Sequence, residues 1–132
     1  MRARLILVPA LVAILAGLIP VAGATAWTTN CSSSGQKVCI YRDDNYGLPL
    51  AAVNGNYDNY NDGSKYPNTN DNINDSANGA KNWYSSNDVI FYNDANDQGG
   101  SFCVNSLTGY QTIGFFNNDR WSSHQVFSST AC

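Results

Sequence analysis

The chain has 132 residues, of which 43% are hydrophobic and only 13% charged, and its formal net charge at pH 7 is −3. A chain of this length holds one small domain with a modest core. All ten acidic residues are Asp, and so acidic a chain is repelled by phosphate backbones and gains nothing from counterion release. We therefore expect no nucleic-acid partner.

The first 26 residues have the pattern of a secretory signal peptide. Arg2 and Arg4 precede a long apolar run, which ends in the small residues Ala24 and Ala26. A basic start, an apolar centre and a small-x-small exit are typical of a cleaved export signal. We expect cleavage after Ala26, with cleavage after Ala24 as the alternative, so that residues 27–132 form one secreted, extracellular domain.

A membrane anchor is the alternative interpretation of the same apolar run, because residues 5–24 are nearly long enough to span a bilayer. Pro9, Pro20 and the small-residue exit argue against it. Removal of the signal takes Arg2 and Arg4 with it and changes the formal net charge from −3 to −5. We expect no membrane association of the mature chain.

Helix signals are almost absent after residue 26. Short apolar or aromatic runs alternate with clusters of Asn, Asp, Gly and Ser, which is the pattern of an all-β domain. We interpret the polar, Tyr-containing stretch 54–72 as a weak strand at 56–60 followed by a long surface loop. The other predicted strands, in chain order, are 37–41, 48–53, 88–92, 101–106, 110–116 and 124–129.

All four cysteines lie after the predicted signal peptide. An even count in an exported chain predicts disulfides, for which three connectivities are possible. Cys31 and Cys39 are near neighbours and are expected to close a small N-terminal loop, which leaves Cys103 to join Cys132. A metal role for these thiols is not expected, because the chain has no C-x-x-C and His124 is its only His.

The chain uses one pattern twice. A predicted strand ending in Tyr41 or Tyr92 is followed in each case by a short Asp- and Asn-rich turn and a Gly. About thirty residues after each Tyr comes a loop of Asn, Asp and Ser, at 71–76 (DNINDS) and at 118–123 (NDRWSS). Two copies of hairpin-then-loop predict two Greek keys packed face to face as a β-sandwich.

The hairpins resemble those of the βγ-crystallin superfamily, whose Greek keys begin with Y/F-x-x-x-x-Y/F/W-x-G. The copy beginning at Tyr41 (YRDDNYGL) has Leu48 in place of the final Gly. The copy beginning at Tyr92 (YNDANDQG) keeps the Gly but has Asp97 at the second aromatic position. The resemblance implies one disulfide-tied sandwich over residues 27–132, with Greek keys at about 37–83 and 88–129.

The loops resemble the calcium motif of the same superfamily, N/D-N/D-x-x-S/T-S. Residues 118–123 fit it fully, and residues 71–76 depart from it only at Asp75. In the superfamily, the third loop residue gives a carbonyl and the fifth a side chain to one ion, while the second reaches the other ion. The implied ligands are the Ile73 carbonyl, Asp75 and Asp119 at one site and the Arg120 carbonyl, Ser122 and Asn72 at the other, with a hairpin carbonyl near Asp43 and near Asn93.

These ligand sets imply two calcium sites of unequal affinity. The site with Asp75 and Asp119 has two carboxylates and the other has none from these positions, and ligand charge is a main control on calcium affinity. We therefore expect the two-carboxylate site to fill first. The alternative is that both loops are Asx- and Ser-rich turns that close the Greek keys without metal.

An exported domain with a Cys pair just before its first key is similar to the actinobacterial peptidase-inhibitor family, of the Streptomyces metalloproteinase inhibitor type. This resemblance implies a rigid monomer that binds a secreted metalloprotease, although no loop motif fixes a reactive bond. The alternative is a non-inhibitory calcium-binding structural module, or an antimicrobial or cell-wall-binding one. Tyr57, Tyr60 and Tyr66, in the polar stretch, would offer an aromatic surface to a partner or a glycan.

We do not expect an enzyme. Asp119, Ser122 and His124 supply the residue types of a hydrolase triad, but they are nearly contiguous, and neighbours on a strand point to opposite faces. No G-x-S-x-G motif, P-loop or pair of Glu residues is present. Asp is too abundant for any pair to stand out as glycosidase carboxylates.

Overall fold

The computed structural model describes residues 27–35, 37–114, 119–128 and 131–132. The predicted signal peptide, residues 1–26, lies outside the described residues. Among the described residues, no helix is long and apolar enough to cross a membrane. The elements are η1 (Ser33–Gly35), β1 (Val38–Asp43), β2 (Gly47–Val53), η2 (Tyr60–Asp62), β3 (Gly79–Asn82), β4 (Asn87–Asp94), β5 (Gln98–Val104), β6 (Gly109–Tyr110) and β7 (Ser123–Ser128).

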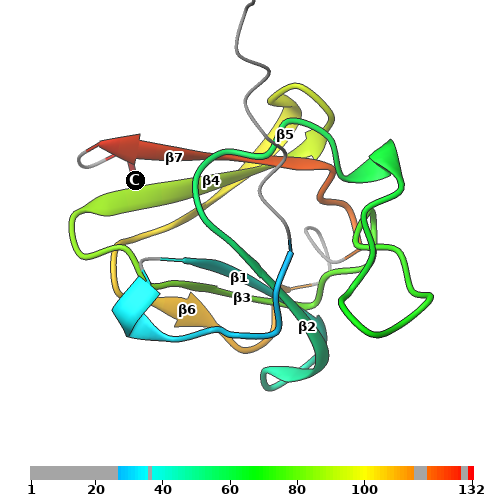
Figure 1. Ribbon diagram of the computed structural model, residues 1–132. Coiled ribbons are helices and arrows are strands. Elements are labelled where there is room, and N and C mark those ends of the chain that lie inside the picture. The colour runs from blue at the N-terminus through cyan, green and yellow to red at the C-terminus, as the bar shows by residue number, and fades with distance from the viewer. Residues whose placement is uncertain (1–26, 36, 115–118, 129–130) are drawn as a thin grey trace, which may run out of the picture.

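The strands form two antiparallel sheets, which lie as two layers in Figure 1. One sheet has the order β2-β1-β3-β6 and the other the order β5-β4-β7. The sheets exchange one strand between the halves of the chain, because β6 follows β5 in sequence but pairs with β3. The predicted all-β sandwich is confirmed.

The β1–β2 and β4–β5 hairpins share one geometry, as the sequence repeat predicts. Each contains a register shift, between Tyr41 and Asp43 in the first hairpin and between Tyr92 and Asp94 in the second. Two consecutive turn residues then have positive φ: Asn45 and Tyr46 in one hairpin, Asn96 and Asp97 in the other, all between 57° and 60°. The two hairpins are therefore equivalent residue by residue, even where the side chains differ.

The core lies between the two sheets and follows the alternation of the strands. Val38 and Ile40 of β1 and Val89 and Phe91 of β4 belong to one fully buried cluster. Trp121, which precedes β7, is also fully buried, and its ring stacks on Phe91 with centroids 4.0 Å apart. The segment that leads into β7 is thus anchored in the core.

Three predictions are wrong, two of them for the polar stretch 54–72 and one for the strand at 110–116. Residues 56–60 form no strand; Tyr57 makes one isolated bridge to His124, and Tyr60 begins η2. Tyr60 and Tyr66 are buried rather than displayed on the surface. The predicted strand 110–116 is reduced to β6, which ends at Tyr110, and residues 115–116 lie outside the described residues.

Both predicted disulfides are confirmed. Cys31 is bonded to Cys39 and Cys103 to Cys132, with Cα atoms 5.8 and 5.7 Å apart. The first ties the N-terminal segment to β1, and the second ties the chain end to β5. No described cysteine is free.

Candidate metal centre

The two Asn- and Asp-rich loops meet through a reciprocal pair of backbone hydrogen bonds. The Asp75 N–H donates to the Trp121 carbonyl at 3.1 Å, and the Asp119 N–H donates to the Ala77 carbonyl at 3.2 Å. Asp75 and Asp119 share the same left-handed backbone, each with a φ of 52°. The two loops are therefore joined where the halves of the sandwich meet.

The pairing of β3 with β1, and of β7 with β4, shows which loop residues are equivalent. Tyr41 pairs with Gly79, just as Tyr92 pairs with Ser123. One residue earlier, the Asn78 N–H donates to the Tyr41 carbonyl and the Ser122 N–H to the Tyr92 carbonyl, both at 2.9 Å. Since Tyr41 and Tyr92 end equivalent strands, Asn78 is the counterpart of Ser122, and Asp75 is the counterpart of Asp119.

This register corrects the expected alignment of the first loop. The stretch equivalent to 118–123 is 74–79 (NDSANG), three residues later than 71–76 (DNINDS). Asn78 and Gly79 thus stand where the calcium motif has Ser or Thr and then Ser. The motif favoured 71–76 because that stretch ends in Ser, and no predicted strand fixed the register.

Asn72 and Ile73 lie before the residues that pair with the other loop. Asn72 is exposed and forms an isolated bridge with Lys65. The Ile73 side chain is fully buried, its N–H donates to the Ser64 carbonyl, and its own carbonyl accepts a hydrogen bond from Ser76 Oγ at 3.0 Å. The other four expected ligand residues, Asp75, Asp119, Arg120 and Ser122, lie at the loop junction or beside it.

Two side chains meet across the junction. Ser122 Oγ donates to Asp75 Oδ1 at 3.4 Å, and Asp75 Oδ2 accepts a hydrogen bond from Asn74 Nδ2 at 2.6 Å. The fifth residue of one loop therefore touches the second residue of the other. Asn78 and Asp119 occupy the equivalent positions in the other half.

Asn78 carries an acceptor without a donor. Its Oδ1 atom is buried and receives no hydrogen bond from any of the described residues. A buried acceptor left unpaired costs roughly 1–3 kcal/mol. A cation beside Asn78 Oδ1 would provide the missing partner.

The chemistry of the junction suits a hard cation with mainly neutral oxygen ligands. Nowhere in the described ranges do three His, Cys, Asp or Glu side chains gather as a metal cluster. Each half of the junction offers one Asp together with a hydroxyl or amide oxygen and backbone carbonyls, which are the ligand types that calcium accepts.

The last motif position distinguishes the two halves. Ser123 Oγ donates to the Asp94 carbonyl at 2.7 Å and accepts from the Asp97 N–H at 3.1 Å, so it ties its loop to the β4–β5 hairpin. Its counterpart, Gly79, has no hydroxyl. A Cβ atom on Gly79 would lie 3.2 Å from the Tyr110 carbonyl oxygen, so close packing favours Gly there.

No protein-family model matches the sequence, and no curated protein is significantly similar to it. Solved structures do resemble the fold. One, from a study of the evolution of the eye-lens βγ-crystallin domain fold, is 17% identical with a TM-score of 0.65, covering 81% of this chain and 100% of that one. A βγ-crystallin domain from Clostridium beijerinckii is 27% identical with a TM-score of 0.53, covering 70% and 99%.

A βγ-crystallin domain from Flavobacterium johnsoniae is 23% identical with a TM-score of 0.56, covering 72% of this chain and 98% of that one. In all three comparisons, the matched region covers nearly the whole chain of the solved structure. The chain therefore has the fold of a βγ-crystallin domain.

Proposed function

We propose that this βγ-crystallin fold serves as a secreted, calcium-binding domain that is stabilised by calcium at the loop junction. The observation that carries the proposal is the buried, unpaired Oδ1 of Asn78. Its counterpart Ser122 contacts Asp75 of the opposite loop, which is the cross-loop arrangement that two paired sites require. The fold gives no reason to expect catalysis.

The ligand sets follow the register of the strands. The first site takes the Asn78 amide oxygen, the Asp119 carboxylate and the Ser76 carbonyl, and the second takes the Ser122 hydroxyl, the Asp75 carboxylate and the Arg120 carbonyl. A further carbonyl comes from each hairpin, near Asp43 and near Asn93. Compared with the sets that the motif alignment implied, Ser76 and Asn78 replace Ile73 and Asp75 in the first site, and Asp75 replaces Asn72 in the second.

Each site then has one Asp, so ligand charge no longer separates the two affinities. We still propose unequal sites, for a different reason. The Ser123 hydroxyl holds the β4–β5 hairpin against its loop, whereas Gly79 has no hydroxyl to make the equivalent bonds to the β1–β2 hairpin. Because less ordering is needed on binding, the site with Ser122 is the tighter one.

Calcium bound between the loops would join the two halves of the sandwich. A ligand that binds only the folded state, present at 100 times its Kd, stabilises that state by about 2.7 kcal/mol. Extracellular calcium modules commonly bind at about 10⁻⁴–10⁻³ M, which fits a stabilising role at extracellular calcium concentrations.

Calorimetric titration of the chelator-treated protein with calcium tests this function. Two binding events are expected, of which Asn78→Ala removes one. The matched control is Asn72→Ala, which changes an exposed Asn of the same segment and leaves both events in place. If calcium gives no heat and no rise in melting temperature, the loops are metal-free turns and the proposal fails.

Inhibition of a secreted metalloprotease is a second candidate function. One observation favours it: Leu107 is 55% exposed on a loop that is held from both sides. Its N–H donates to the Tyr84 carbonyl at 3.1 Å, and the neighbouring Ser106 N–H donates to Asp88 Oδ1 at 2.9 Å. An apolar side chain on a rigid loop can bind a protease pocket at little entropic cost.

Inhibition is tested by titrating the protein against a panel of secreted metalloproteases. An inhibitor slows one of them at near-equimolar concentration, survives uncleaved, and loses potency with Leu107→Asp. If every protease retains full activity, or if the chain is degraded, the inhibitory role is rejected and the calcium proposal is unaffected.

A further inference from the structure

Strand β2 lies at the edge of its sheet. On its outer side only one of its residues, Ala52, pairs with another described residue. Thr28 and Ala52 exchange two backbone hydrogen bonds of 2.9 and 2.8 Å. The chain then turns away, because the Asn30 N–H donates to Thr28 Oγ1 and the Cys31 N–H to the Thr29 carbonyl. The added strand therefore stops after a single pair.

The next backbone groups on this edge belong to Leu50. Alternate residues of a strand direct their N–H and C=O groups to the same side. The backbone N–H and C=O of Leu50 therefore point to the outer edge, as those of Ala52 do. No described residue extends the Thr28–Ala52 pairing to Leu50. Pro49 comes one residue before Leu50 and has the opposite orientation, so its missing N–H faces β1 and leaves the outer edge able to pair.

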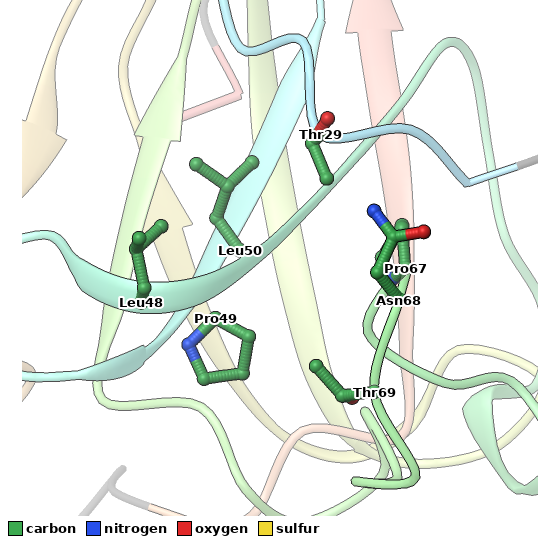
Figure 2. A pocket seen from close by; sticks show the side chains of 7 residues that line it. All are labelled: Thr29, Leu48, Pro49, Leu50, Pro67, Asn68 and Thr69. Atoms are coloured by element: carbon green, nitrogen blue, oxygen red, sulfur yellow. The ribbon is translucent and has the colours of Figure 1, made fainter.

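A groove of about 350 Å³ runs along this open edge. In Figure 2, Leu48, Pro49 and Leu50 lie on β2, and Thr29 and residues 67–69 lie across from them. Leu48 is 68% exposed, and none of the lining residues is charged. Exposed edge strands are usually protected by charged side chains, and this stretch lacks them.

We propose that this groove binds an extended, uncharged peptide segment of a partner protein, which pairs with β2 at Leu50 as an added antiparallel strand. The peptide would continue, in the same direction, the edge pairing that Thr28 already makes with Ala52. This mode satisfies the Leu50 backbone, whereas an apolar ligand without a backbone would leave it unpaired.

The lining of the groove decides the chemistry of the peptide. A charged side chain would lose water against Leu and Pro side chains with no opposite charge among the lining residues, which is costly. A volume of about 350 Å³ lies at the lower end of the range for ligand sites, so the groove holds only a few residues. The occupant is therefore a short, uncharged strand, and the proposal does not depend on calcium.

The test uses the blocked peptide acetyl-Thr-Val-Thr-Val-Thr-amide and the purified protein in calorimetric titrations. Two protein variants place a negative charge in the groove: Leu48→Asp, at an exposed position, and Asn68→Asp, a near-isosteric change on the opposite wall. The matched control is Leu107→Asp, which changes an exposed Leu outside the groove. The peptide control is the same sequence with every backbone nitrogen methylated.

We expect binding that weakens at least tenfold in both groove variants and is unchanged in Leu107→Asp. Amide hydrogen exchange at Leu50 slows at least tenfold when the peptide is present, and the methylated peptide does not bind. Equal binding of the methylated peptide, or an unprotected Leu50 amide, rules out strand pairing. A dimer that Leu48→Asp abolishes, seen by sedimentation, would assign the groove to a second copy and overturn the proposal, as would absence of binding at millimolar peptide.

Discussion

The Tyr60 hydroxyl donates a hydrogen bond to Nδ1 of His124 across the core, at 2.5 Å. The direction follows from the other ring nitrogen, because Nε2 lies 2.9 Å from the Gly55 carbonyl, which can only accept. His124 is fully buried and therefore neutral, with its proton on Nε2. This pair links η2, in the first half of the chain, to β7 at the end of the second.

Acid should weaken the fold through His124. Burial lowers the pKa of His124 from 6.5 to about 4, although the Gly55 carbonyl opposes the shift. The neutral imidazole is favoured in the folded state, so its contribution is complete above pH 6.5 and is lost as the pH falls towards 4. A shift of this size corresponds to about 3 kcal/mol, which urea unfolding at pH 7 and pH 4 can measure.

His124→Gln is the matched control for this prediction, because it removes the titrating group while keeping a donor and an acceptor. The difference in stability between pH 7 and pH 4 should be smaller in the variant by about 3 kcal/mol. An identical pH dependence in both proteins would assign acid sensitivity to the carboxylates instead.

Asp88→Ala should loosen the C-terminus. The Asp88 carboxylate accepts hydrogen bonds from the Cys132, Ser106 and Ala131 N–H groups at 3.1, 2.9 and 2.8 Å, and these bonds lower its pKa. Without the carboxylate, amide exchange at Ser106 and Ala131 should speed up and the melting temperature should fall. Asp58→Ala, at an exposed position, is the control, and equal effects of the two changes would contradict the anchoring role.

Trp121→Ala should destabilise the fold by about 3–5 kcal/mol, the usual cost of truncating a buried aromatic residue. The Trp121 ring is fully buried and stacks on Phe91 and on Phe102, with centroids 4.0 and 5.6 Å apart. Chemical denaturation measures the loss. Trp83→Ala is the comparison, because Trp83 is only partly buried, and it should cost clearly less.

The sequence predicted the sheets well where apolar residues alternate with a strand period. Val38 and Ile40, and Val89 and Phe91, mark strands whose inward face can be identified from the alternation alone. Strand β3, with the sequence GAKN, has no such signal. Its Gly79 is small because it packs against the Tyr110 carbonyl, a constraint that exists only in the folded chain.

Because β3 is not among the predicted strands, the motif alignment places the first loop three residues too early. Without β3, nothing in the sequence fixes which loop residue stands opposite Tyr41, so the motif favours the stretch that ends in Ser. The composition of the loops and their pairing could be predicted, and four of the six expected ligand residues lie at the loop junction or beside it. The positions of Ser76 and Asn78 could not, because they depend on the pairing of Tyr41 with Gly79.

The observed register of the loops and the motif alignment predict different effects of substitutions at Asp75 and Asp119. In the ligand sets that we propose from the observed register, Asp119 and Asp75 belong to different sites, so Asp119→Asn should weaken one calcium-binding event and Asp75→Asn the other. With the alignment of 71–76 to 118–123, both changes would weaken the same event and spare the second. Calorimetric titration of the two single variants and the double variant distinguishes these outcomes.

Loss of one carboxylate per site should weaken each event severalfold or more, because ligand charge controls calcium affinity. The double variant should lose both events, with effects that add, since the two carboxylates act on different ions. Ser123→Ala should weaken the event that Asp75→Asn weakens, because Ser123 ties the hairpin to the Ser122 loop. If Asp75→Asn and Asp119→Asn reduce one event together and leave the other intact, the observed register does not describe the calcium sites.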